Sequence, residues 1–239
     1  MIRSLVFVLA VLAGSAQAQN SDEFIRANLL SVLYHELGHA IIDLVQLPVF
    51  GQEEDAADVA SILLINELFD EATATEIAYD SAFGFLGEAR TIEQDGQDPA
   101  WWDLHGPDLQ RYYNLVCLFA GANIDERSDI AGELGLPQDR LDTCEEEFTL
   151  ADDSWGPVFD DLAVDSPGTS MIYDGVTDTL AEKLVAEEVA ALNRDFSLPQ
   201  DLAISVASCG EPNAFYDPET VEIIMCAEMV NWLRELPVD

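Results

Sequence analysis

This sequence contains few positively charged residues. Its 239 residues include nine lysines and arginines, of which Lys183 is the one lysine, against 47 aspartates and glutamates, for a formal net charge of −38. Nucleic acids and anionic lipids are held through clustered lysines and arginines, so the composition excludes both as partners. The 49% of apolar and 9% of aromatic residues exclude a disordered acidic tail and predict a soluble globular chain with one sizeable core.

Long apolar runs are also scarce, and the one that stands out opens the chain. Arg3 precedes an apolar stretch from Leu5 to Leu12, and Ala16-Gln17-Ala18 has the form of a signal-peptidase cleavage site. The run is too short to span a bilayer. We therefore predict that residues 1–18 are a signal peptide, that the mature protein is secreted or periplasmic, and that it inserts in no membrane after cleavage.

Cysteine is limited to four residues: Cys117, Cys144, Cys209 and Cys226. An even number of cysteines in an exported chain indicates disulfides. No two are at the CxxC spacing of a zinc–thiolate site. Of the three possible pairings we favour Cys117–Cys144 with Cys209–Cys226, because each of these closes a local loop between predicted elements; four free buried thiols are the alternative.

Histidine is scarcer still, with three residues, and two of them fall in one short motif. His35-Glu36-Leu37-Gly38-His39 is an HExxH sequence inside an apolar pattern of helical spacing. Histidines at i and i+4 share one helix face, so both imidazoles can reach one metal ion. Glu36 stands beside them, placed to take a proton from water at that ion. A chance motif with histidines in the core or at the surface is the alternative.

A zinc peptidase site needs a third protein ligand, and the extended HExxHxxGxxH form is absent because Ile42 and Val45 stand at its last two positions. The next helix offers carboxylates instead. Glu54 and Asp58 share a face of that helix, so Glu54 can bind zinc while Asp58 accepts the outer N–H of a ligand histidine. Glu53 competes with Glu54 for the ligand role. A helix N-terminus that carries acidic residues without any metal is the alternative.

The third histidine, His105, comes just before the next predicted helix. A histidine or tyrosine facing the metal can stabilise the oxyanion of a tetrahedral intermediate, and His105, Arg111, Tyr112 and Tyr113 are the candidates. For His105 the competing interpretation is a loop histidine that caps a helix. For the tyrosines we favour packing and hydrogen bonding within the fold.

Periodicity along the chain favours a mainly helical α+β fold. Asp22 or Ser21 is expected to cap the first helix. Leu202–Ala207 is expected as a strand, followed by a hairpin over Asn213–Tyr216 and Val221–Cys226 and a short last helix. The helices predicted before this last one cover 22–46, 53–69, 73–90, 107–121, 137–147, 155–162 and 179–193. The predicted organisation is a core over 19–163, a linker over 164–178, and a helix with a cysteine-flanked hairpin over 179–239 that packs on this core.

Several of these segments resemble the bacterial "putative metallopeptidase" domain family, which is zincin-like. The resemblance rests on HELGHA followed by GQEEDAAD, on Asp103-Leu104-His105 leading through QRYYN to Cys117, on Leu136 to Glu145, and on Cys209-Gly210-Glu211-Pro212-Asn213-Ala214-Phe215-Tyr216-Asp217. In that family the last segment precedes the HExxH helix, whereas here it comes last. The order therefore resembles a circular permutation, which requires chain ends that lie close together and a hairpin that packs beside the helix of His35.

Taken together, the motifs and the resemblance predict a secreted zinc metallopeptidase of the gluzincin type, acting on peptides or proteins. His35, His39 and Glu54 are its expected metal ligands, Glu36 and His105 its expected catalytic residues, and Asp58 the partner of a ligand histidine. A binding or structural envelope protein on a zincin scaffold is the alternative. We expect the remaining carboxylates to be spread over the surface; an acidic wall along the cleft would instead indicate basic substrates.

Overall fold

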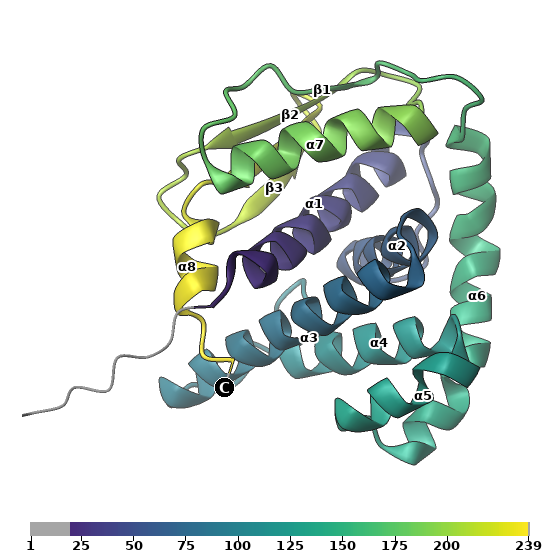
Figure 1. The fold of residues 1–239 in the computed structure, drawn as a ribbon, viewed down its shortest axis with the longest axis vertical. Coiled ribbons are helices and arrows are strands. Elements are labelled where there is room, and N and C mark those ends of the chain that lie inside the picture. Colours follow the sequence, from purple (N-terminus) through teal and green to yellow (C-terminus); the bar gives the residue numbers. More distant parts are fainter. Residues whose placement is uncertain (1–19, 239) are drawn as a thin grey trace, which may run out of the picture.

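One long helix, α1 (Asp22–Leu44), runs through the middle of the molecule (Figure 1). The structure is a computed structural model that describes residues 20–238, so the predicted signal peptide lies outside the described residues. Ser21 caps α1 by accepting a hydrogen bond from the backbone N–H of Phe24. Fifteen of its 23 residues are buried. Apolar side chains surround this helix on most sides, which is typical of a core helix rather than a surface one.

Helices pack below α1 and a small sheet packs above it in the view of Figure 1. The described chain contains eight helices and four strands, so the predicted mainly helical α+β class is confirmed. After α1 the elements are α2 (Glu53–Leu68), α3 (Glu71–Gln94), α4 (Asp108–Gly121), α5 (Ile124–Glu133), α6 (Gln138–Leu162), β1 (Met171–Ile172), α7 (Leu180–Asp195), β2 (Leu202–Ala207), β3 (Ala214–Asp217), β4 (Glu222–Cys226) and α8 (Met229–Glu235).

The sheet has the order β1-β2-β4-β3. β2 pairs in parallel with both β1 and β4, and β3 pairs antiparallel with β4 as an edge strand. The predicted hairpin is therefore present, and β3 lies along α1, where the hydroxyl of Tyr216 donates a 2.7 Å hydrogen bond to Asp43. This contact brings the hairpin beside the helix that carries the HExxH motif.

The two ends of the described chain meet at α8. The side chain of Asn20 donates hydrogen bonds to the carbonyls of Leu233 and Leu236, and Arg234 pairs with Asp22. A circular permutation needs such proximity, and the permutation itself stays a prediction.

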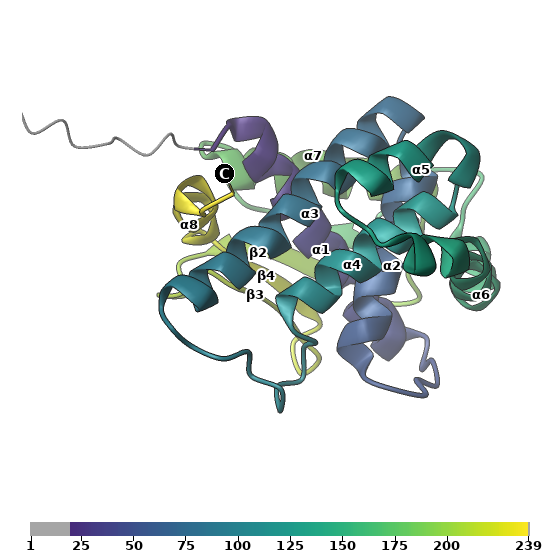
Figure 2. The ribbon, with the colours of Figure 1, turned by 90° about the horizontal axis from the view of Figure 1, so that it is seen from below.

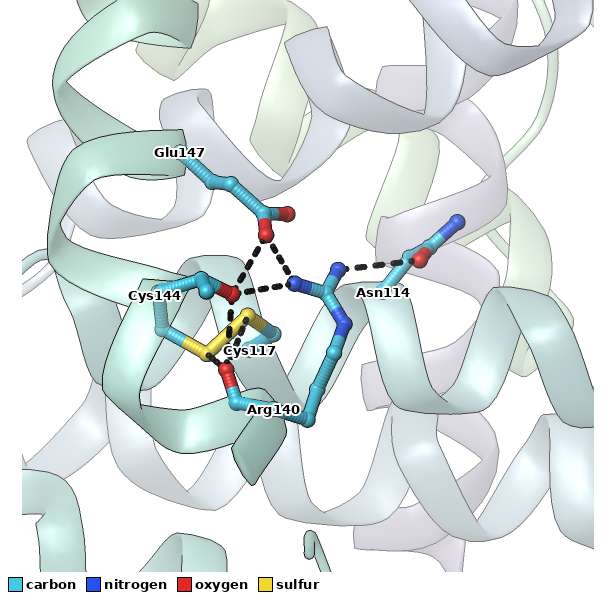
Figure 3. Close-up of a disulfide and its surroundings, with 6 residues drawn as sticks. Asn114, Cys117, Arg140, Cys144 and Glu147 are labelled. Carbon is cyan, nitrogen blue, oxygen red and sulfur yellow. Dashed lines mark hydrogen bonds and ion pairs between the residues drawn. A yellow bond between two sulfur atoms is a disulfide. The ribbon is translucent and has the colours of Figure 1, made fainter. Parts of the chain in front are cut away.

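Both favoured disulfides are present. Cys117–Cys144 joins α4 to α6, with Arg140 and Glu147 paired beside it (Figure 3), and Cys209–Cys226 joins the end of β4 to the loop before β3. Gly121 makes the first of these junctions possible, because a Cβ there would lie 2.1 Å from the carbonyl oxygen of Cys144.

Three parts of the chain differ from the expectation. The helices expected over 137–147 and 155–162 are one continuous helix, α6, which contains Pro157. Packing of its apolar face on the core outweighs the one backbone hydrogen bond that a proline removes. α5 was not expected, because its buried residues are only Arg127 and Ala131, and this leaves almost no apolar periodicity. The expected linker over 164–178 contains β1, which the sheet holds against β2.

The boundaries of the remaining helices differ by a few residues at most. α3 is longer than expected, because Asp70 rather than a later residue caps it by accepting from the backbone N–H of Thr73. Among the described residues, no helix has both the length and the apolar character needed to cross a membrane.

Candidate metal centre

Two turns of α1 place the histidines of the HExxH motif on one face. The ring centres of His35 and His39 lie 4.8 Å apart, and their Nε2 atoms are 3.2 Å apart. His35 and Glu36 are buried, with 6% and 8% of their surface exposed. Polar groups at such depth are costly without partners, so the surroundings of these side chains decide what they do.

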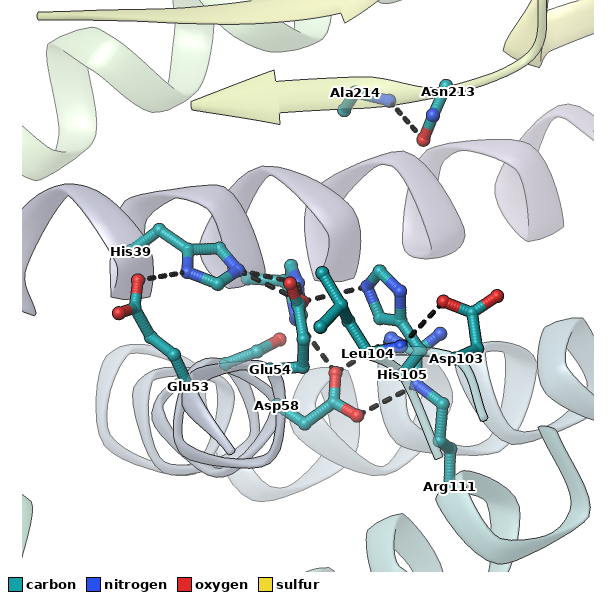
Figure 4. A network of polar contacts seen from close by, with 12 residues as sticks. His39, Glu53, Glu54, Asp58, Asp103, Leu104, His105, Arg111, Asn213 and Ala214 are labelled. Atoms are coloured by element: carbon teal, nitrogen blue, oxygen red, sulfur yellow. Dashed lines mark hydrogen bonds and ion pairs between the residues drawn. The ribbon is translucent and has the colours of Figure 1, made fainter. Parts of the chain in front are cut away.

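The N-terminal turns of α2 supply these partners. Glu54 directs Oε2 to both imidazoles, at 3.2 Å from Nε2 of His35 and 3.1 Å from Nε2 of His39 (Figure 4). Gly38 makes this approach possible, because a Cβ on it would lie 3.0 Å from Cα of Ala57. The two helices therefore cross where neither has a bulky side chain.

Three atoms that can bind a metal ion, Nε2 of His35, Nε2 of His39 and Oε2 of Glu54, therefore form a nearly equilateral triangle. Its sides are 3.1, 3.2 and 3.2 Å long. Tetrahedral zinc with bonds of about 2.0 Å separates its nitrogen and oxygen ligands by about 3.3 Å. Two imidazole nitrogens and one carboxylate oxygen are also a ligand set that zinc accepts. The residues present therefore fit a divalent ion of this type.

The outer nitrogens of both imidazoles are already engaged by carboxylates. Nδ1 of His35 lies 2.8 Å from Asp58, and Nδ1 of His39 lies 2.9 Å from Glu53. An Nδ1 that donates to a carboxylate leaves Nε2 of the neutral ring as an acceptor. Two such acceptors that face each other at 3.2 Å need a proton or a cation between them, which supports the fit to a metal ion.

The pKa values of these groups follow from the same contacts. Burial acts to lower the pKa of His35, but hydrogen bonds with Asp58 and Glu54 outweigh it and raise the pKa to about 9. Burial also acts to lower the pKa of His39, but hydrogen bonds with Glu54 and Glu53 outweigh it and raise this pKa. Hydrogen bonds from all three histidines hold the pKa of Glu54 well below its usual range. In the metal-free protein, protons therefore hold the triangle together.

Arg111 fixes the outer carboxylate of His35. Its Nε and one terminal nitrogen each donate a 2.8 Å hydrogen bond to Asp58, while its guanidinium lies over the ring of Phe85. Burial acts to raise the pKa of Asp58, but Arg111 and His35 outweigh it and lower this pKa below the usual range. Asp58 is therefore ionised and oriented, as a partner of a metal-binding histidine needs to be.

Glu36 lies beside the triangle but outside it. Burial raises its pKa, while the two histidines and the backbone N–H of Tyr216 on β3 partly counter the effect. A raised pKa brings a carboxyl group nearer to the range in which it can both accept and return a proton. Tyr216 was not expected at the site, although it belongs to the segment that resembles the family and lies in the hairpin expected beside the helix of His35.

His105 comes from the connection between α3 and α4. Its Nε2 lies 2.8 Å from Oε2 of Glu54, its ring stacks on His35 with centres 5.7 Å apart, and 45% of its side chain is exposed. Ligand atoms of His35, Glu54 and His105 lie within 4.8 Å of one another. All three histidines of the chain therefore contact one carboxylate oxygen, and two overlapping triads, one with His39 and one with His105, share His35 and Glu54.

The other oxyanion candidates have different partners. The guanidinium of Arg111 is directed at Asp58, and the hydroxyl of Tyr112 donates to the carbonyl of Leu134 away from the site. Tyr113 packs edge-on against Tyr112. The role of Arg111 as the partner of Asp58 was missed, because a separation of 53 positions hides the pairing in the sequence.

The histidines and carboxylates of this centre line a cleft of about 1940 Å³ between α1, β3 and the α3–α4 connection, and Figure 2 shows this connection in the same view as the hairpin. The lining contains ten carboxylates among 44 residues, against 47 among 239 in the chain. The cleft is therefore as acidic as the rest of the chain, and no acidic wall sets it apart.

A comparison with models of known protein families identifies the family of this chain. A family model described as "Putative metallopeptidase" matches residues 8–158 and 167–237. The chain belongs to this family. Membership in a metallopeptidase family implies a metal and a peptide or protein substrate, and the triangle of His35, His39 and Glu54 lies inside the matched residues. No curated protein and no solved structure matches the chain.

Proposed function

We propose that this protein is a secreted or periplasmic zinc metallopeptidase of the gluzincin type. The observation that supports this most directly is the triangle of His35 Nε2, His39 Nε2 and Glu54 Oε2, whose sides match the ligand spacing of tetrahedral zinc. Three protein ligands leave a fourth position for water or substrate, as in catalytic zinc sites.

His35, His39 and Glu54 would hold the ion, with Asp58 and Glu53 orienting the two imidazoles. When bound, a zinc ion supplies a Lewis acid that polarises a carbonyl and increases the acidity of water. Glu36 takes the proton of the attacking water and transfers it to the departing nitrogen of the peptide bond. Its burial suits this task, because a raised pKa makes the carboxylate a stronger base toward the proton of water.

His105 and β3 complete the site. An imidazole at the open side of the cleft can donate a hydrogen bond to the oxygen that becomes negative during attack, and we assign this role to His105. β3 is an edge strand that lies along α1, and an extended peptide can pair with such an edge. Two disulfides support the proposed location outside the cytoplasm.

The test is metal analysis of the purified protein combined with a peptide-library assay of wild type and Glu36→Gln. We expect one equivalent of zinc in both proteins and cleavage only by wild type. Glu145→Gln on α6 is the matched control, because Glu145 is exposed and lies outside the cleft. Stoichiometric zinc without cleavage under any condition would count against a peptidase.

The contact between His105 and Glu54 favours a second candidate, a binding or structural protein with a closed metal site. In that case His105 would be a fourth ligand and would leave no position for water. His105→Ala distinguishes the two. A fall in zinc affinity of tenfold or more indicates a ligand, whereas unchanged affinity with slower turnover indicates a residue that acts on the substrate.

A further inference from the structure

The backbone of β3 presents two of its N–H groups at the free edge of the sheet. The N–H of Cys226 on β4 donates a 3.0 Å hydrogen bond to the carbonyl of Asn213, where this strand pair begins. In an antiparallel pair, residues that bond to the partner strand alternate with residues whose backbone groups point the other way. Phe215 therefore bonds toward β4, whereas the N–H groups of Ala214 and Tyr216 point away from the sheet.

At this edge the N–H of Tyr216 meets Glu36, the glutamate of the HExxH motif. A hydrogen bond from this N–H acts on the carboxylate of Glu36, whereas His35 and His39 act on it through their charge. Glu36 is buried and lines the same cleft as Tyr216. A buried carboxylate needs a hydrogen-bond donor, and a long, flexible glutamate side chain also needs one to keep a single orientation.

The side chain of Tyr216 joins β3 to the same face of α1. Its hydroxyl donates a 2.7 Å hydrogen bond to Oδ2 of Asp43, which is 173 positions away in the sequence. Asp43 follows Glu36 by about two helical turns, so both carboxylates lie on one face of α1, about 10 Å apart along its axis. Burial and the hydrogen bond with Asp43 raise the pKa of Tyr216 well above its usual range, so the hydroxyl keeps its proton and remains the donor.

Tyr216 therefore contacts α1 at two points, through its hydroxyl at Asp43 and through its backbone at Glu36. We propose that Tyr216 and Asp43 are positioning residues: the hydrogen bond between their side chains holds β3 at the place on α1 where the N–H of Tyr216 orients the carboxylate of Glu36. The proposal rests on the proposed function, because it concerns the orientation of the residue that acts there as the base. A displacement of reacting groups by about 1 Å can slow an enzyme about 100-fold, so a small shift of β3 would be measurable.

The first test follows the backbone amide of Tyr216 by NMR and needs no turnover. The full mature chain is prepared with ¹⁵N-labelled tyrosine, and Tyr216→Phe identifies the resonance by its loss. We expect Glu36→Gln to shift this resonance, because the acceptor loses its charge. Asp43→Ala should speed hydrogen exchange of the same amide about tenfold, which corresponds to the loss of one hydrogen bond. Asp43→Asn keeps an oxygen that accepts from the hydroxyl, so its exchange rate should match that of wild type.

The second test measures turnover of a peptide that wild type cleaves. Tyr216→Phe and Asp43→Ala should each lower kcat about tenfold to 100-fold, with KM within about twofold of wild type and zinc affinity unchanged. The double substitution should be no slower than either single one, because both remove the same hydrogen bond. Asp43→Asn should restore kcat to within about twofold of wild type. Tyr173→Phe is the matched control for both tests, since it removes a hydroxyl that donates to the carbonyl of Val176 outside the cleft; it should change neither amide exchange nor kcat.

Thermal melts of each variant separate positioning from simple attachment. A lower melting temperature with unchanged kcat and unchanged exchange of the Tyr216 amide would show that the hydrogen bond only attaches the sheet to α1, and would overturn the proposal.

This inference and the peptidase can fail independently. If wild type cleaves no peptide while the Tyr216 amide responds to both Glu36→Gln and Asp43→Ala, the positioning contact stands and the peptidase fails. If wild type cleaves peptides and Asp43→Ala keeps its kcat, the peptidase stands and the positioning role is refuted.

Discussion

Gly38, between the two histidines of the motif, sets the distance between α1 and α2, and its substitution tests the geometry of the metal centre. A Cβ at this position would lie 3.0 Å from Cα of Ala57 and 3.2 Å from Cβ of Ala60. Ordinary contacts between carbon atoms are about 3.5–4.0 Å. In Gly38→Ala the helices must therefore separate by roughly 0.5 Å.

Gly38→Ala has two opposing effects on the free energy of unfolding, whereas its effect on zinc affinity has one direction. Alanine is favoured over glycine in a helix by about 1 kcal/mol, while overpacking costs about 1–3 kcal/mol, so we expect a net loss of about 1 kcal/mol. Metal–ligand distances tolerate only about 0.2 Å. Glu54 on α2 would move away from the imidazoles on α1, and we expect zinc affinity to fall about tenfold to 100-fold.

The measurements are urea unfolding and competition with a zinc-binding dye. The matched control is Gly132→Ala on α5, where a Cβ meets nothing within 4 Å; it should gain stability and keep its zinc affinity. If Gly38→Ala binds zinc as wild type does and is stabilised like the control, the close approach of the two helices does not position the ligands and the reasoning is refuted.

Three further predictions follow from the same structure. Asp58→Asn loses its paired contact with Arg111 and should lower stability by about 2 kcal/mol in urea unfolding and zinc affinity by about tenfold or more; unchanged affinity would rule out its orienting role. Burial raises the pKa of Glu88 on α3 from 4.5 to about 8. Glu88→Gln should therefore match wild type near pH 4 and be more stable at pH 9 in thermal melts, because ionising this carboxyl as pH rises through that window destabilises the folded state; a constant difference would contradict this. Replacing Cys209 and Cys226, 17 residues apart, by serine should cost about 3 kcal/mol, and no loss would show that the bridge does not constrain the unfolded chain.

Local patterns in the sequence were enough for much of the fold. Periodic apolar residues predicted α1, α2, α4 and α7 within a few residues, since amphipathic spacing is a local property. The same applies to the strand pair around Asp217-Pro218-Glu219-Thr220, where the turn residues are adjacent. α5 and the continuous α6 were missed because packing on distant elements, and not their own composition, stabilises them.

The sequence by itself determined how the residues of the HExxH motif are arranged, because a helix brings residues four apart to one face whatever surrounds it. His35, Glu36 and His39 could therefore be placed together, and the spacing of Glu54 and Asp58 predicted how they would meet them. Only the tertiary structure decided that Glu54 rather than Glu53 lies at both Nε2 atoms. It also brought His105 and Arg111 to the same cleft, since contacts between residues far apart in the chain depend on how the helices pack.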